Sequence, residues 1–441
     1  MATTSVETLQ QITGEIGHFD PLLTQSFLQE EFDQLYQLIA SLNSGGPIEF
    51  NVTSSERQYL DLNNSRLCVR VKITKADGTN LDADTAGPIN LTLHSLFKDV
   101  YAELNNKAVS DSSQMYPYRA YVETVLNFTD ETQKTRLLTE GWVKDTTGHM
   151  GVTTVNGANL GLRSRTTKFA RSAIVELVGR PHLDIFHQDR LIPPGVSMFL
   201  KLIRANDSFV IKSAAAQGQA AQENFKVVLE KVHLLIHKKK LSADAEMYQL
   251  KQLEQKTMRL AISRVEVRHL TITANDNNFY QDAVFRGTLP DMVIIGLVAE
   301  ADFAGGYQRN PFNFQHFNVN KIELMRNHEC VPTLGYHPDF TNSHYINDYF
   351  TMLGQVNCHS GNQIVSLTPE EWATGYTLYA FKITAGPIGS GTEVPRSHSN
   401  SGVISLRIGF SKAPTANVKV IVFSQGFGLI EIDSNYRVVV S

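Results

Sequence analysis

Residues that could bind a metal ion gather between positions 328 and 359 of the sequence. They are His328, Cys330, His337, Cys358 and His359. Imidazole nitrogen and thiolate sulfur are preferred ligands of Zn²⁺, but the spacing of these residues fits none of the common zinc-binding patterns. A Cys–His nucleophile pair drawn from the same group lacks an identifiable orienting acid and an oxyanion donor. We therefore predict no metal-binding and no catalytic residues here.

The glycine motifs of nucleotide-binding and hydrolytic enzymes are also missing. Gly426-Phe427-Gly428 begins like a dinucleotide fingerprint, but Glu431 occupies the position of the third glycine and a strand is expected to follow. The chain contains no Walker A motif and no GxSxG motif. It also lacks the His and Glu signature of metal-binding cupin jelly rolls. We predict that the protein is not an enzyme and binds no cofactor.

Two clusters of basic residues are candidates for nucleic-acid contacts. The first contains Arg163, Arg165, Lys168 and Arg171, and the second is His237–Lys240. The first contains one aromatic residue, Phe169, and such clusters are usually solvated faces. The formal net charge of −4 also argues against a protein that coats DNA, because that role requires a large basic excess. We predict no sequence-specific nucleic-acid binding.

Length and composition limit the remaining choices. A chain of 441 residues is too long for one ordinary core, so two domains are expected. No window holds 18 consecutive apolar residues, and we expect no transmembrane segment. The first residues lack the basic and apolar regions of a secretory signal. The odd number of cysteines, three, suits a reducing compartment.

The first 46 residues read as an N-terminal arm that precedes the strands. Apolar residues spaced by four and three predict an amphipathic helix there, with an extended arm containing a short helix as the alternative. An exposed apolar stripe of this size is unfavourable unless something covers it. We therefore mark its members as possible assembly contacts: Leu28, Phe32, Leu35, Ile39 and Leu42.

Strand patterns begin at Pro47 and fill most of the chain. Leu67–Ile73 and Ile89–Leu93 alternate apolar and polar residues, as half-buried antiparallel strands do. Asn105-Asn106 predicts a turn, helical spacing follows around Tyr118, and Asp145–Arg171 reads mainly as loop. About eight strands with one helical insertion are enough for a two-sheet sandwich.

A helix then interrupts the strands, and the strand pattern restarts after it. Leu241–Lys256 contains no Val, Ile, Thr, Gly or Pro, and Ser242 can cap it. Residues 258–441 match the size and strand count of residues 47–240. We therefore divide the chain into an arm (1–46), a first jelly roll (47–240), a connecting helix (241–257) and a second jelly roll (258–441). The predicted fold is all-β with minor helices: two tandem antiparallel eight-stranded jelly rolls.

The second half contains the most distinctive strand patterns. Met292–Val298 is apolar on both parities, so both faces of that strand should be covered. An aromatic-rich strand is expected from Phe312, and the change of parity at Phe317 predicts a bulge or a corner between sheets. Thr384–Gly402 is rich in Gly, Ser and Pro and predicts an exposed loop.

Several short segments, in order along the chain, resemble the major capsid proteins of Polinton (Maverick) elements and their adintovirus relatives. These segments are Pro47–Phe50, Tyr59–Ile73, Tyr116–Tyr121, Lys144–Met150, Gly287–Ala301, Tyr307–Leu324 and Leu429–Asp433. The resemblance implies a hexon-like double jelly roll that forms trimeric capsomers of an icosahedral shell around double-stranded DNA. It also implies a single jelly-roll penton or minor capsid protein as partner. The protein would be made in the host cytoplasm, with assembly possibly in the nucleus, and would reside in the virion capsid.

Two other functions fit the same strand pattern. One is a cellular jelly-roll binding protein, such as a lectin-like protein, or a host-domesticated capsid copy. The other is a hydrolase whose site one sequence does not reveal. A capsid protein predicts homotrimers and particles, whereas a lectin-like protein predicts a monomer or small oligomer with a ligand cleft. We expect the capsid protein because the resemblance implies it, and the residues assemble no convergent polar site that would favour the alternatives.

Overall fold

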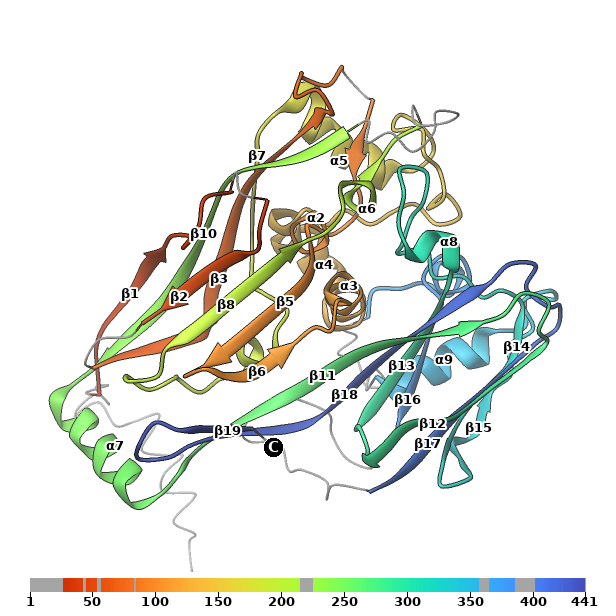
Figure 1. The fold of residues 1–441 in the computed structure, drawn as a ribbon. Helices are drawn as coiled ribbons and strands as arrows, with labels where there is room; N and C mark the ends of the chain where they lie inside the picture. The colour runs from red at the N-terminus through yellow and green to blue at the C-terminus, as the bar shows by residue number, and fades with distance from the viewer. Residues whose placement is uncertain are drawn as a thin grey trace, which may run out of the picture.

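Antiparallel sheets dominate the computed structural model of the chain, which describes residues 27–42, 45–53, 57–82, 85–214, 225–356, 365–384 and 401–440. Each half of the chain contributes two sheets that face each other (Figure 1). The first half lies at the upper left of the view and the second at the lower right. Together they form the double jelly roll that the sequence predicts.

The first jelly roll is a sandwich of two four-stranded sheets. One sheet contains, in spatial order, β1 (Leu28–Tyr36), β10 (Phe225–Leu241), β3 (Gln58–Lys75) and β7 (Val175–Gly179). The other contains β2 (Ile48–Val52), β8 (Met198–Arg204), β5 (Phe97–Leu104) and β6 (Lys107–Asp111). A separate pair is formed by β4 (Gly87–Pro88) and β9 (Ile211–Lys212). The predicted turn at Asn105-Asn106 is confirmed, since both residues have positive φ between β5 and β6.

Short helices fill the connections of the first jelly roll. They are α2 (Thr92–Ser95), α3 (Tyr116–Asn127), α4 (Asp130–Lys134), η2 (Arg136–Glu140), α5 (Leu160–Phe169), η3 (Ala170–Ser172), η4 (Asp184–His187) and α6 (Asp207–Val210). The Thr129 side chain accepts a hydrogen bond from the Thr132 N–H and caps α4. The loop predicted over Asp145–Arg171 is wrong in part, because α5 forms there with Asn159 as its N-cap.

Two predicted elements of the first half take another form. The strand expected over Ile89–Leu93 is wrong: only β4 precedes it, and α2 begins at Thr92. The polar residues of this segment do not face water, because Asn90, Thr92 and His94 are all buried and hydrogen-bonded. Apolar and polar residues therefore alternate in this segment although it does not form a half-exposed strand.

The helix predicted in the arm is also wrong, and strand structure begins before Pro47. Leu28–Tyr36 forms β1, which pairs with β10 along the edge of the first sheet. A spacing of four places Leu28 and Phe32 on one face of a helix, but four is also even, so the same residues share one face of a strand. The segment forms a strand and not a helix because the edge of β10 is available to pair with it.

The second jelly roll repeats the sandwich. One sheet contains β11 (Met258–Ile272), β18 (Val418–Ile432), β13 (Met292–Ala299) and β16 (Leu378–Lys382), with β19 (Val438–Val440) paired to β18. The other contains β12 (Asn278–Thr288), β17 (Ser401–Phe410), β14 (Val319–Arg326) and β15 (Glu329–Tyr336). Its helices are α8 (Glu300–Phe303), α9 (Ile346–Gln355) and α10 (Pro369–Ala373). Most of the predicted loop Thr384–Gly402 lies outside the described residues.

Strand β13 confirms the expectation for the apolar run, since Met292–Val298 is buried on both parities. The aromatic strand expected from Phe312 is wrong. Phe312 is buried in a turn, Phe314 is buried and forms isolated β-bridges with Gly375 and Tyr376, and β14 begins only at Val319. Phe317 has φ +46° in the left-handed region, which is where the parity changes. The burial of β13 is internal to the jelly roll, so this strand leaves no apolar face for another subunit.

Helix α7 (Ala243–Gln255) links the two jelly rolls, and Ser242 caps it by accepting a hydrogen bond from the Ala245 N–H. The two halves also share their cores. The ends of β11 and β18 carry Leu260 and Ile430 into the first core. Helix α3, between the halves in Figure 1, carries Tyr121 into the second core. The jelly rolls are therefore packed against each other.

Candidate functional site

The candidate metal ligands that the sequence offered do not come together in the part of the chain that the structure describes. His328 lies in the β14–β15 turn, Cys330 is a part-buried free thiol on β15, and His337 follows the end of that strand. The extended strand β15 separates the two histidines. Cys358 and His359 lie outside the described residues.

Members of both basic clusters form ion pairs within the fold. The Arg165 side chain is buried on α5 and pairs with Asp145 at 2.7 Å. In the second cluster, the His237 ring lies 2.9 Å from Asp33 on β1 and Lys239 Nζ lies 3.4 Å from Glu31. The second cluster therefore fastens the edge strand β1 to β10 through opposite charges.

The five predicted assembly contacts are not equivalent in the structure. Leu28 and Phe32 are half-buried on β1, and Leu42 packs partly against the first core. Leu35 and Ile39 are 44% and 60% exposed. Only Leu35 and Ile39 therefore offer apolar surface to a partner.

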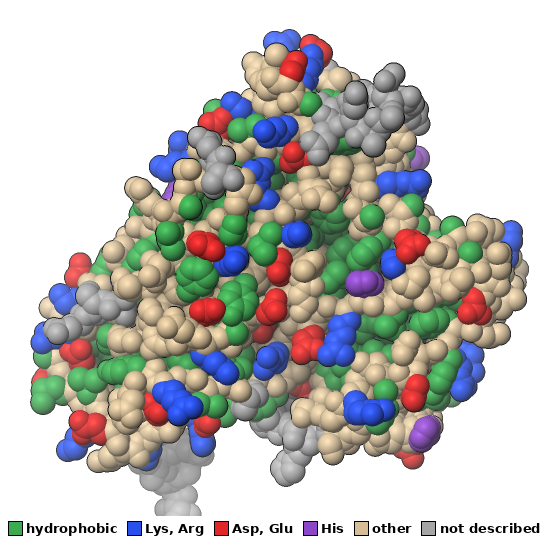
Figure 2. All heavy atoms as spheres, viewed as in Figure 1, with side chains coloured by type: hydrophobic (Ala, Val, Ile, Leu, Met, Phe, Trp, Pro, Cys, Tyr) green, Lys and Arg blue, Asp and Glu red, His purple; other side chains and the backbone are tan. Residues whose placement is uncertain are grey.

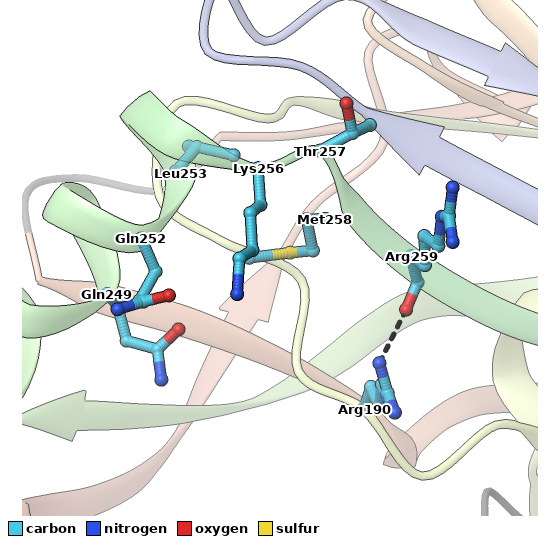
Figure 3. A pocket seen from close by; sticks show the side chains of 8 residues that line it. All are labelled: Arg190, Gln249, Gln252, Leu253, Lys256, Thr257, Met258 and Arg259. Atoms are coloured by element: carbon cyan, nitrogen blue, oxygen red, sulfur yellow. Dashed lines mark hydrogen bonds between the residues drawn. The ribbon is translucent and has the colours of Figure 1, made fainter.

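A cavity of about 560 Å³ lies between α7 and the start of β11 (Figure 3). It is lined by Arg190, Gln249, Gln252, Leu253, Lys256, Thr257, Met258 and Arg259. Arg190 donates a hydrogen bond to the backbone carbonyl of Arg259 at 2.7 Å, and Arg259 pairs with Glu431 at 2.9 Å. The lining supplies positive charge and amide groups, and it contains no carboxylate or histidine that could serve as a general base beside Lys256 or Thr257.

The molecular surface mixes charges of both signs with apolar patches. Figure 2 shows apolar side chains in groups over both jelly rolls, with basic and acidic side chains interspersed. Large exposed apolar side chains include Leu334 on β15, Phe350 on α9 and Met247 on α7, at 82%, 60% and 70% exposure. Such side chains, when grouped, are typical of surfaces that bind other proteins.

A buried polar cluster lies where α2, α3, η2 and η4 meet. His94 Nδ1 is 2.8 Å from the Tyr116 hydroxyl, and His94 Nε2 is 3.2 Å from Glu140 Oε2. His182 Nδ1 is 2.5 Å from Glu123 Oε2. The His94 and His182 rings meet edge to face with centroids 4.5 Å apart. All five residues are at most 8% exposed, so the cluster is shielded from solvent.

Arg119 connects this cluster to the second jelly roll. Its guanidinium donates to Glu123 Oε1 at 3.0 Å and to Asp184 Oδ1 at 2.6 Å. Asp184 Oδ1 also accepts from the Val265 N–H on β11 at 3.3 Å. Arg119 and Asp184 therefore carry a polar connection from α3 to the second domain.

Burial and neighbouring charge shift the pKa values in the cluster. Burial lowers the pKa of His94, and burial also lowers the pKa of His187 to about 3. Burial acts to raise the pKa of Glu123, but the Arg119 charge and the His182 hydrogen bond outweigh it and hold that pKa well below its usual range. Glu123 is therefore ionised, which fixes His182 as the donor from Nδ1.

This cluster is hard to find in the sequence because its members span residues 94–187 without a recognisable spacing. The alternation around Ile89–Leu93 predicted that His94 faces solvent, so the local pattern pointed away from the cluster.

Comparison with known proteins shows which solved structures share the fold of this chain. No protein-family model matches the chain. An uncharacterized protein of Caenorhabditis elegans is 22% identical over 424 residues, and the alignment covers 93% of this chain and 97% of that protein. The structure of the Sputnik virophage matches with a TM-score of 0.64 at 10% identity, covering 96% of this chain and 90% of that one. The fold is that of the viral double jelly-roll capsid proteins.

Two further structures support this assignment of the double jelly roll. PBCV-1 VP54, fitted into a reconstruction of Sputnik, matches with a TM-score of 0.61 at 8% identity over 96% of this chain and 99% of that one. The Faustovirus major capsid protein matches with a TM-score of 0.54 at 9% identity over 96% and 97%. At these identities the likeness concerns the fold. Of the helices in the described ranges, none is long and apolar enough to cross a membrane.

Proposed function

We propose that the protein is a major capsid protein of the Polinton/adintovirus type, and that it forms the shell around double-stranded DNA. The observation that carries the proposal is the match to Sputnik over 96% of the chain, which spans both jelly rolls and their link. A likeness to a single jelly roll would fit many binding proteins. A likeness to the tandem arrangement narrows the choice to proteins that use two sandwiches in one chain.

The tandem arrangement suggests how the shell is built. The two jelly rolls supply two similar domains, the first with β1 at the edge of one of its sheets, and helix α7 links them. Three chains around a threefold axis would present six similar domains, and such a block can have six neighbours in a closed shell. Closed sandwiches also limit exposed sheet edges, which protects a protein that assembles at high local concentration.

Surface features support contacts with other chains. Leu35 and Ile39 stand exposed beside the edge strand β1, and Phe350 stands exposed on α9. Covering such side chains is favourable, at about 25 cal/mol for each Å² of apolar surface removed from water. We place the lattice contacts of the arm at Leu35 and Ile39. A single jelly-roll penton or minor capsid protein is the expected further partner, and the virion is the expected location.

The oligomeric state and the particles test the proposal. Light scattering of the purified chain should give a homotrimer, and electron microscopy should show pseudo-hexagonal capsomers or closed shells. A stable monomer of 49.2 kDa at micromolar concentration would contradict it. A monomer that bound a glycan array would favour the lectin-like alternative.

A further inference from the structure

The buried cluster of His94, Glu140 and His182 has the donor atoms of a metal site. One ligand atom from each residue lies within 4.8 Å of the others, and all three residues are buried. Two imidazoles and one carboxylate form a common ligand set for Zn²⁺. Zinc bonds of about 2.0–2.2 Å place tetrahedral donor atoms about 3.3–3.6 Å apart. His94 Nε2 and Glu140 Oε2 already lie 3.2 Å apart.

The hydrogen bonds around the two histidines direct the required atoms inward. His182 donates from Nδ1 to Glu123, so its Nε2 carries a lone pair, and no donor among the described residues reaches that atom. The Nδ1 of His94 lies 2.8 Å from the Tyr116 oxygen, which can accept a hydrogen bond from Nδ1–H and so leave the Nε2 lone pair for a metal. The same oxygen accepts a hydrogen bond from the backbone N–H of His182 at 3.2 Å. Metal-binding histidines usually hold a carboxylate or another acceptor on the second ring nitrogen, as both histidines do here.

The charges of the cluster leave room for a cation. Arg119 pairs with Glu123 and Asp184. Among the described residues Glu140 forms an ion pair with the His94 ring, and its side chain is 4% exposed. Arg136 and Arg180 interact with this carboxylate through their charges without forming an ion pair with it in the described part of the chain. A buried carboxylate is unfavourable unless it is compensated, and a divalent cation bound directly to Glu140 and both histidines would add to that compensation.

A glycine keeps the space for the Glu140 side chain. A Cβ added to Gly179 on β7 would lie 2.6 Å from Glu140 Cγ. Any larger residue would therefore displace this carboxylate from its position beside His94.

We propose that His94 Nε2, His182 Nε2 and the Glu140 carboxylate bind one Zn²⁺ per chain, with Glu123 and Tyr116 orienting the histidines. The site would tie α2 and η2 to the segment that leads into η4, and through Asp184 to the second jelly roll. It would thus stabilise the junction between the domains.

Zn²⁺ and Co²⁺ titrations of the untagged full-length chain, stripped with a chelator, test this proposal. We expect one equivalent of Co²⁺ to give the visible absorption of a tetrahedral site, and Zn²⁺ to displace it and raise the melting temperature. Glu140→Gln, which keeps the size of the side chain, should weaken binding by at least about 100-fold. Glu123→Gln, which removes the negative charge of the acceptor for His182, should weaken it by about 10–100-fold.

The matched control is His328→Gln, because His328 is exposed in the β14–β15 turn. It should bind metal like the wild-type chain. If folded wild-type protein takes up no Co²⁺, or if Glu140→Gln binds as tightly as wild type, the proposal is wrong. If Glu140→Gln does not fold, the Co²⁺ spectrum of the wild-type chain and the metal affinity of Glu123→Gln test the proposal.

Discussion

The ring of Tyr121 stacks on the ring of Phe312 with centroids 4.3 Å apart and planes 7° apart. Tyr121 lies on α3 in the first half of the chain and Phe312 in the second, and neither is accessible to solvent. Offset stacking of this kind adds to the free energy of burial. The contact therefore joins the two jelly rolls.

Tyr121→Ala should weaken the junction. Removing a buried aromatic side chain costs roughly 3–5 kcal/mol, because transfer energy is lost and a cavity remains. Both tryptophans, Trp142 and Trp372, belong to the core that Tyr121 enters, so their fluorescence during urea unfolding reports on that core. We expect the transition to move to lower urea concentration in this variant. Tyr121→Phe keeps the ring and should unfold like wild type; equal losses in both variants would contradict the role of stacking.

Lys212 gives the protein a pH-dependent stability in alkaline solution. Its ammonium group is buried and donates to the Met150 and Val152 carbonyl oxygens at 2.6 and 3.0 Å. Burial lowers its pKa to about 8. The unfolded chain, with an ordinary lysine pKa, binds more protons between that value and about 10.4, so this group adds stability as pH rises through the interval.

The measurement compares wild type with Lys212→Met, which lacks the titrating group. Between pH 7.5 and pH 9, wild type should gain about 1 kcal/mol of unfolding free energy relative to the variant. Urea denaturation at the two pH values gives this difference. Lys168→Met, at an exposed position, should show no such change relative to wild type. If the difference in unfolding free energy between wild type and Lys212→Met is the same at both pH values, Lys212 does not titrate between them.

The edge strand β1 should detach from β10 in acid before the cores unfold. The hydrogen bond with His237, and then the charge of Arg66, hold the pKa of Asp33 below its ordinary value of 3.8. A lowered carboxyl pKa adds stability above the ordinary value, and that stability is lost as pH falls below it through the folded value. Hydrogen exchange of residues 28–36 should therefore accelerate below about pH 3.8.

Asp33→Asn should produce faster exchange of β1 at neutral pH, and high salt should shift wild type in the same direction because exposed ion pairs are screened. Asp77→Asn, in the turn after β3, is the control. Its carboxylate also has a lowered pKa but does not contact β1. Unchanged exchange of β1 in Asp33→Asn would mean that backbone pairing alone holds the strand.

Strand patterns in the sequence predicted the double jelly roll because most strands bury one parity or both. β13 is the clearest example, since a run that is apolar on both parities has to be covered on both faces. β1 was mistaken for a helix because Leu28 and Phe32 suit either period, and its partner β10 lies about 200 residues away. A contact at that separation leaves no local pattern.

The buried cluster escaped prediction for a related reason. His94, Glu140 and His182 come from separate connections between strands, and only the packing of α2, η2 and the segment before η4 brings them together. The histidines that were close in sequence, His328 and His337, lie at opposite ends of β15. Proximity in sequence was therefore a poor guide to proximity in this fold.

The exposed apolar residues beside β1 should matter for shell assembly and not for folding. Leu35 and Ile39 are exposed, whereas Phe32 and Leu42 are half-buried. The double variant Leu35→Glu, Ile39→Glu removes two apolar contacts and adds two charges without opening a core. We expect soluble trimers with wild-type melting temperature that do not form shells. Gln37→Glu adds a charge between the two positions and removes no apolar side chain, so it should assemble normally. If the double variant forms shells, Leu35 and Ile39 are not lattice contacts. If it is monomeric, the two residues belong to the trimer interface instead.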